Sequence, residues 1–173
     1  DTYDATNGLS GASLTTIYET TDGSIVVGSA DGLLMLIPGL EKISDTNGDI
    51  PAKFIGNDAK NNMWFFDNST IYRHNGTKIT AYDAEQNFDF NAIDDALITG
   101  TGEIWVRVDW RGLYRWTGEK WQFYDESTGL NMGRVTWWYS SNDNDFFVGG
   151  NQSGNIFRYD PERDEFNRWS WRP

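Results

Sequence analysis

The segment Ile93-Asp94-Asp95-Ala96-Leu97-Ile98-Thr99-Gly100-Thr101-Gly102-Glu103-Ile104-Trp105 contains a pattern that occurs four times in the chain. Apolar residues occupy its first and fourth positions, a small polar residue the seventh, Gly or Asn the tenth, and an apolar pair the twelfth and thirteenth. The copies superpose without gaps and begin at Leu14, Ala52, Ile93 and Val135, at intervals of 38, 41 and 42 residues. A period of this length indicates a repeat architecture.

Each copy continues into a polar loop, a further apolar stretch and a closing aromatic or branched segment, which leaves room for four short strands. Helices fit poorly, because no window keeps apolar residues at helical spacing and Gly or β-branched residues interrupt each candidate. Radial stacking of four twisted sheets would bury the faces that one unit alone leaves wet. We therefore predict an all-β protein, a β-propeller of four tandem four-stranded blades, which is either a closed four-bladed ring or part of a larger or oligomeric propeller.

The predicted blades form a single domain over residues 1–173 and cover approximately residues 8–44, 45–83, 84–126 and 127–170. The segment Tyr3-Asp4-Ala5-Thr6-Asn7-Gly8-Leu9 matches Tyr124-Asp125-Glu126-Ser127-Thr128-Gly129-Leu130. Residues 1–6 are therefore predicted to be the end of a preceding outer strand. Because the fourth blade already has its own outer strand, this surplus implies a partly open edge, and open edges recruit strands. We expect residues 1–6 to contact the fourth blade of the same chain or of a neighbouring copy.

The composition limits the partners of the protein. A formal net charge of −12 would repel nucleic-acid phosphates and anionic membrane surfaces, so neither is expected as a partner. No apolar run approaches the ~18 residues of a membrane span, so membrane insertion is not expected. The chain has no Cys, which excludes disulfides and thiolate metal sites and leaves the redox compartment undetermined.

Several stretches of the repeat resemble a known family, the two-component regulator propeller repeat. The resemblance covers nearly the whole chain. Three departures are that Asn61 and Asn144 stand where Gly is usual, that Arg107 replaces the second Gly, and that residues 67–70 lack the Gly-Leu pair. The stretches that carry the resemblance are Asn7-Gly8-Leu9-Ser10, Gly23-Ser24-Ile25-Val26-Val27-Gly28-Ser29, Gly102-Glu103-Ile104-Trp105-Val106, Gly112-Leu113-Tyr114-Arg115 and Thr128-Gly129-Leu130.

Propellers of this family usually form periplasmic sensor regions of hybrid two-component systems. The resemblance thus implies a bacterial periplasmic or extracellular location and a role in sensing carbohydrate. The chain contains neither a membrane helix nor a kinase, so it is either an excised piece or a repeat recruited elsewhere.

Two groups of residues are candidates for ligand binding. Asp109-Trp110-Arg111 lies in a loop where the repeat needs no apolar side chain. An exposed Trp beside an acid and a guanidinium can stack on a sugar ring while the charged groups hold its hydroxyls. Trp137 and Tyr139 flank the core position Trp138 on a predicted strand, and they either bind ligand near the central channel or pack against an adjacent blade.

Carboxylates in the loops and inter-blade linkers are expected to form either a solvated rim or a negative face. Within this set, Asp45-Thr46-Asn47-Gly48-Asp49 offers oxygen ligands at positions 1, 3 and 5 of a calcium loop through Asp45, Asn47 and Asp49, but it lacks Gly at 6 and Glu at 12. No other cofactor is expected.

Catalysis has little support in the sequence. His74 is the only histidine and stands in a turn without a recognisable nucleophile. We therefore expect a non-catalytic extracytoplasmic module that presents an acidic, Trp-bearing face to a glycan or similar polar ligand. The alternatives are a structural subunit that self-associates through open blade edges in a surface layer or filament, and a propeller lyase or hydrolase.

Overall fold

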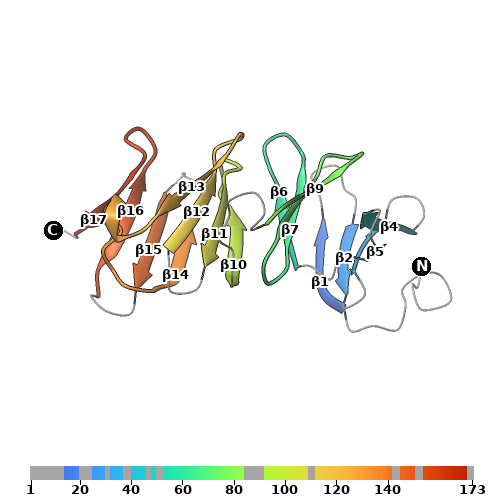
Figure 1. Cartoon of the computed structure of the whole chain (residues 1–173), viewed down its shortest axis with the longest axis horizontal. Helices are drawn as coiled ribbons and strands as arrows, with labels where there is room; N and C mark the ends of the chain where they lie inside the picture. The colour runs from blue at the N-terminus through green and yellow to red at the C-terminus, as the bar shows by residue number, and fades with distance from the viewer. Residues whose placement is uncertain are drawn as a thin grey trace. The chain divides into compact units, whose positions relative to one another are not determined.

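The structure is a computed structural model that describes residues 14–19, 25–29, 32–36, 40–45, 48–49, 53–83, 92–108, 112–141, 145–150 and 154–170, with only the backbone for most of residues 28–49. It confirms the predicted all-β architecture: the described residues form four sheets of consecutive antiparallel strands (Figure 1). Within these ranges, none of the helical segments has the length and apolar character that crossing a membrane requires. Residues 1–87 and residues 88–173 form two compact units.

The first unit contains two sheets. The first sheet has a fifth, two-residue strand beyond the predicted four, and the second sheet follows the predicted four-strand order. The strands are β1 (Leu14–Glu19), β2 (Ile25–Ser29), β3 (Gly32–Leu36), β4 (Leu40–Asp45) and β5 (Gly48–Asp49), then β6 (Lys53–Asn57), β7 (Met63–Phe66), β8 (Ile71–His74) and β9 (Ile79–Tyr82).

The second unit contains the third and fourth sheets, joined by a short 3-10 turn at Glu126–Thr128. Asp125 caps this turn, Gly129 ends it with φ 94°, and Leu130 is buried. This geometry explains the Tyr-Asp…Thr-Gly-Leu motif of the repeat, because only a residue that tolerates the left-handed region ends such a turn without strain. The strands are β10 (Ile93–Ile98), β11 (Ile104–Val108), β12 (Gly112–Trp116) and β13 (Trp121–Tyr124), then β14 (Val135–Ser140), β15 (Phe146–Gly150), β16 (Ile156–Asp160) and β17 (Glu165–Trp169).

The hairpin between β6 and β7 shows why the repeat accepts Asn in place of Gly. Asn61 has φ 60°, a left-handed conformation that Asn adopts more readily than other non-Gly residues. The side chain of Asp58 accepts hydrogen bonds from the backbone of Asn62 at 2.9 Å and from the indole Nε1 of Trp64 at 2.9 Å. Asp58, at the small polar position of the repeat, therefore holds the turn and also accepts the hydrogen bond of the buried Trp64 indole.

Each sheet uses its two faces differently. We call the face that carries the second residue of the apolar pair (Val26, Trp64, Trp105 or Phe147) the forward face of its sheet, and the opposite face the rear face. In the first unit, Val26 on the forward face of the first sheet packs against Met63 and Phe65 on the rear face of the second.

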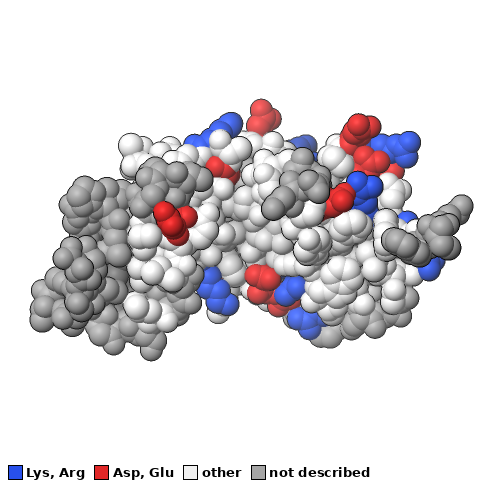
Figure 2. All heavy atoms as spheres, turned by 180° about the vertical axis from the view of Figure 1, so that it is seen from behind, with Lys and Arg blue, Asp and Glu red and all other residues white. Residues whose placement is uncertain are grey.

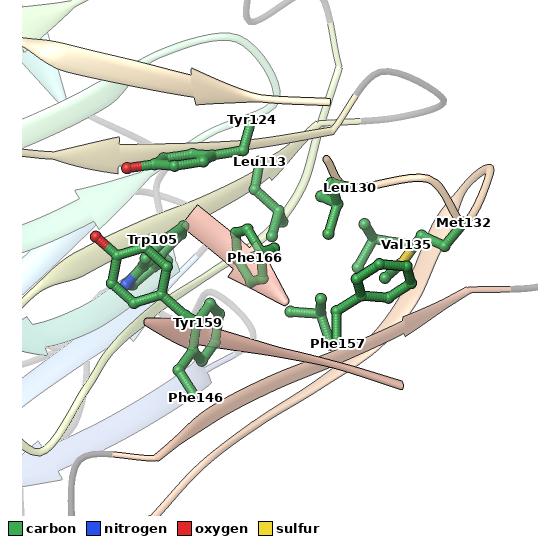
Figure 3. Packing of buried hydrophobic residues seen from close by; sticks show 11 residues of the cluster. Trp105, Leu113, Tyr124, Leu130, Met132, Val135, Phe146, Phe157, Tyr159 and Phe166 are labelled. Carbon is green, nitrogen blue, oxygen red and sulfur yellow. The ribbon is translucent and has the colours of Figure 1, made fainter. Parts of the chain in front are cut away.

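In the second unit, the forward face of the third sheet packs on the rear face of the fourth (Figure 3). Trp105 is completely buried, and its ring centroid lies 4.6 Å from that of Phe146 and 4.9 Å from that of Tyr159. Aromatic rings at such distances add stability beyond the burial of their area. The core thus depends on a few large rings at frame positions.

Candidate functional site

A cluster of four charged side chains lies where the first two strands of the third sheet meet β14. Arg107 on β11 is the register partner of Asp95 on β10. In the first and fourth sheets the residues at the same register position are Gly28 and Gly149, and in the second sheet the equivalent residue is Phe66. Arg107 is thus the only charged residue at this position of the repeat. We call Asp94, Asp95, Arg107 and Arg134 the Arg107 cluster.

The geometry of the Arg107 cluster alternates positive and negative groups. The Nε of Arg107 lies 3.8 Å from Oδ2 of Asp94, and its Nη2 lies 4.0 Å from Oδ2 of Asp95. The Nη2 of Arg134 donates to the same oxygen of Asp94 at 3.2 Å. The bulge between Ile93 and Asp95 in the β10–β11 register places both carboxylates within reach, because a bulge redirects side chains.

Arg107 also contacts the fourth sheet. Its Nη1 donates to the carbonyl oxygen of Thr136 at 3.2 Å, and its guanidinium carbon lies 5.3 Å from the ring centroid of Trp138. The Arg107 side chain is only 18% exposed. Among the described residues, its Nε has no hydrogen-bond acceptor, so a largely buried donor retains capacity for one more bond.

Trp137 and Tyr139, which the sequence singled out, both project from the forward face of the fourth sheet. Trp137 is 40% exposed and Tyr139 is 59% exposed. Trp137 covers Gly149, where an added Cβ would lie 2.2 Å from the indole. Because alternate residues of a strand face opposite ways, these two rings lie on the other side of β14 from Trp138 and the guanidinium of Arg107. The structure therefore brings Trp137 and Tyr139 together but does not join them to the Arg107 cluster.

The remaining sequence candidates are mostly beyond the described residues. Asp109, Trp110, Arg111 and Asn47 lie outside them, as do residues 1–6, while Asp45 and Asp49 are described only as backbone on β4 and β5. Within the part of the chain that the structure describes, no group of three or more His, Asp or Glu side chains could hold a metal ion. Binding of ligand by Asp109-Trp110-Arg111 and of calcium by Asp45, Asn47 and Asp49 stays a prediction.

The only histidine, His74, lies on β8 and is half-buried. Burial lowers the pKa of His74, so its imidazole is held in the neutral form at neutral pH.

Acidic and basic side chains lie side by side in small groups on the face shown in Figure 2.

Sequence reasoning missed three members of the Arg107 cluster. Arg107 itself was visible as a departure from the repeat. Asp94 and Asp95 are spacer residues of the frame, and Arg134 precedes the fourth copy, so only the bulge and the packing of the third sheet on the fourth bring them together.

Comparison with solved structures shows the fold. A streptogramin B lyase is 15% identical, with a TM-score of 0.65 over 91% of this chain and 54% of that chain. The extracellular domain of a hybrid two-component system from B. thetaiotaomicron is 14% identical, with a TM-score of 0.68 over 91% of this chain and 23% of that chain. A virginiamycin B lyase from Staphylococcus aureus is 14% identical, with a TM-score of 0.64 over 91% of this chain and 55% of that chain.

The chain spans about half the length of the two lyases and about a quarter of the sensor domain. No protein-family model matches the sequence, and no curated protein matches it. The similarity to these structures, together with the four antiparallel sheets of four or five strands, identifies the fold: the chain is an all-β protein of the β-propeller type, as its repeat predicted.

Proposed function

We propose that the protein is a non-catalytic, extracytoplasmic recognition module that binds a neutral glycan at the Arg107 cluster. The observation that carries the proposal is a largely buried Arg at a position where two other sheets have Gly, with an Nε that has no acceptor among the described residues. The first and fourth sheets form with Gly at this position, so the fold of a sheet does not require a charged side chain there. Recruitment for a ligand explains the departure.

The chemistry of the cluster suits sugar hydroxyl groups. Each hydroxyl both donates and accepts a hydrogen bond, and the cluster presents guanidinium donors and carboxylate acceptors within about one side-chain length of each other. Two Arg and two Asp side chains carry no net charge between them, which favours a neutral ligand over a strongly ionised one. The predicted Trp110 loop begins two residues after Arg107 and would supply the ring-stacking surface.

An extracytoplasmic location rests on the resemblance of the repeat and on the fold. One solved structure of similar fold is the extracellular domain of a hybrid two-component system. Two others are lyases, which keeps a propeller lyase as the rival hypothesis. Recognition is the preferred hypothesis because the sequence frame around His74, the only histidine, contains no recognisable nucleophile.

The test is the substitution Arg107→Gly, which restores the residue of the repeat and removes the donor. Wild-type protein should bind at least one member of a panel of neutral oligosaccharides in isothermal titration calorimetry. Arg107→Gly should weaken that binding at least about tenfold, because a buried charge-assisted hydrogen bond is lost. The protein should still fold, because Gly is present at the same register position in two other sheets, but its melting temperature should fall, because the variant loses the contacts of Arg107 with Thr136 and Trp138.

Two further variants guard the interpretation. Asp95→Asn keeps the shape of a side chain that is 46% exposed and should also weaken binding, even if Arg107→Gly proves unstable. Arg163→Ala removes a guanidinium that is 73% exposed on the β16–β17 turn and should leave binding unchanged. Equal affinity of wild type and both site variants, or no binding to any oligosaccharide, would show the proposal to be wrong.

A further inference from the structure

The hairpin between β8 and β9 carries an exposed Asn-Gly pair in its turn. The turn consists of Asn75, Gly76, Thr77 and Lys78, all of which are exposed. The backbone N–H of Asn75 donates to the carbonyl oxygen of Lys78 at 3.2 Å and closes the turn. Gly76 has φ 90°, and a Cβ added there would meet no atom within 4 Å. Solvent therefore reaches the peptide bond that joins Asn75 to Gly76.

The side-chain oxygen of Asn75 accepts three hydrogen bonds within this turn. The donors are the N–H of Lys78 at 2.8 Å, the N–H of Thr77 at 3.2 Å and the hydroxyl of Thr77 at 3.0 Å. An amide nitrogen could not accept from these groups, so the contacts also determine which atom of the amide faces them. Three donors on one carbonyl oxygen draw electron density from its carbon, Cγ, which becomes a better electrophile.

A nucleophile lies next to this carbon in the chain. A bond between the backbone nitrogen of Gly76 and Cγ of Asn75 would close a five-membered ring, and groups held so near each other react at a high effective concentration. Among the described residues, the N–H of Gly76 has no acceptor. The nitrogen is therefore available, and the missing Cβ leaves its approach unhindered.

The preceding hairpin, between β7 and β8, has a turn of the same form with a carboxylate in place of the amide. The N–H of Asp67 donates to the carbonyl oxygen of Thr70 at 3.0 Å, and its Oδ1 accepts from the N–H groups of Ser69 and Thr70, both at 2.8 Å. Asn68 in this turn is also exposed, but the N–H that follows it, that of Ser69, is held by Asp67. Asn68 thus lacks both features that make Asn75 reactive.

We propose that Asn75 is a site of spontaneous modification, at which water converts the side-chain amide into a carboxylate through cyclisation with Gly76. Hydroxide removes the proton of the Gly76 nitrogen, and the freed electron pair forms a bond to Cγ of Asn75. The carbonyl electron pair moves onto Oδ1, where the donors of Thr77 and Lys78 stabilise the charge. The pair then returns as the bond from Cγ to Nδ2 breaks, and Nδ2 takes a proton from water and leaves as ammonia.

Water then opens the ring at one of its two carbonyl carbons. Attack at Cγ leaves an aspartate in the native backbone, whereas attack at the backbone carbon leaves an isoaspartate, in which the chain runs through the side chain. The overall reaction consumes one water, releases one ammonia and oxidises nothing. The aspartate product keeps the turn, as the turn of Asp67 shows. The isoaspartate product lengthens the backbone by one atom beside the paired residues His74 and Ile79 and should disturb that pairing.

The first experiment incubates the folded protein in ¹⁸O-labelled water at mildly alkaline pH and follows each Asn by peptide mass spectrometry. Residue 75 should gain one labelled oxygen, in two products that chromatography separates, at a rate proportional to the hydroxide concentration. Asn68 is the internal control and should stay unlabelled. Asn7 and Asn47 also precede Gly but lie outside the described residues, so their peptides are followed separately. An unchanged Asn75, or labelling of Asn68 at the same rate, would contradict the proposal.

The second experiment tests the donors. Thr77→Val removes the hydroxyl and keeps the shape of an exposed side chain, and Thr77→Ser retains the hydroxyl. In the folded protein, Thr77→Val should slow the conversion of Asn75 about threefold to tenfold, the factor that corresponds to one net hydrogen bond. Thr77→Ser should react at nearly the wild-type rate. In concentrated urea all three proteins should react equally, because the turn is lost, and circular dichroism should confirm that they are folded without urea.

Two results of the second experiment would overturn the proposal. Equal rates for wild type and Thr77→Val in the folded state would mean that the donors do not activate Cγ, and conversion in urea alone would mean that the turn protects Asn75. The variant Asn75→Asp tests the product. It should melt at the wild-type temperature, and a lower melting temperature would show that the turn does not accept the carboxylate.

Discussion

Asp164 shows how one side chain can connect two sheets. It lies in the β16–β17 turn with φ 57° and accepts hydrogen bonds from the hydroxyls of Tyr124 and Tyr159 and from Arg115. Burial alone would raise the pKa of Asp164, but these hydrogen bonds and the charge of Arg115 lower it. The stability that Asp164 contributes is therefore present above the pKa of the unfolded chain, about 3.9, and is lost as the pH falls through the folded value.

The stability that Tyr124 contributes depends on pH in the opposite direction, because it is lost as the pH rises. Burial, with the hydrogen bond to Asp164, raises the pKa of Tyr124 to about 12, whereas an unfolded Tyr ionises near pH 10, about its ordinary value. Stability from this group is thus complete below about pH 10 and declines as the pH rises towards 12. A spectrophotometric titration should show Tyr124 among the last phenols to ionise in the folded protein.

The variant Asp164→Asn tests this assignment. Removing the carboxylate should lower the pKa of Tyr124 and move part of the phenolate absorbance to lower pH. Asp160→Asn, on the same hairpin, should leave the titration unchanged. If both variants titrate as wild type does, then the network does not control the ionisation of Tyr124.

At the scale of elements, the start of β12 depends on a glycine for space. Gly112 has φ 146°, and a Cβ there would lie 2.1 Å from the carbonyl oxygen of Tyr124 on β13. Backbone cannot move aside as a flexible side chain can. Gly118, in the next turn, has φ 96° but nothing within 4 Å of an added Cβ.

Gly112→Ala should therefore destabilise the protein by about 2 to 4 kcal/mol, since the clash adds to the conformational strain. Gly118→Ala should cost about 1 kcal/mol, from strain alone. Urea denaturation with an unchanged m-value measures both. Equal costs would mean that the hairpin relaxes around Gly112.

The sequence predicted the strands well because turns and apolar pairs are local signals. The Gly102 and Asn61 positions both have φ in the left-handed region, so the frame that aligned them marked real turns. Sites assembled from different sheets leave no such signal. Arg115 and Asp164 are far apart in sequence, and Asp94 meets Arg134 only through packing of one sheet on the next.

At the scale of the whole molecule, residues 88–173 contain a complete core of their own. The cluster around Trp105 draws all of its members from the third and fourth sheets and their connection. We expect a fragment of residues 88–173 to fold cooperatively, because this core does not need residues 1–87. A fragment of residues 127–170 lacks Trp105 and Leu113, so the rear face of its sheet stays exposed and it should not fold.

Thermal unfolding followed by near-ultraviolet circular dichroism distinguishes the two fragments. A sigmoidal transition with fixed aromatic signals is expected for residues 88–173 and not for residues 127–170. A broad, featureless transition in the longer fragment would mean that the core requires contacts from residues 1–87.

The pairing of Trp137 with Gly149 also constrains how the protein can evolve. Any side chain at position 149 would overlap the indole, so mutations at the two sites must occur in a fixed order. A lineage can gain a side chain at 149 only after the ring at 137 has been replaced by something smaller. The third sheet shows the reverse arrangement, with the long Arg107 opposite the short Asp95. Related sequences should therefore show covariation between these two positions: a large side chain on one strand should be paired with a small one on the other.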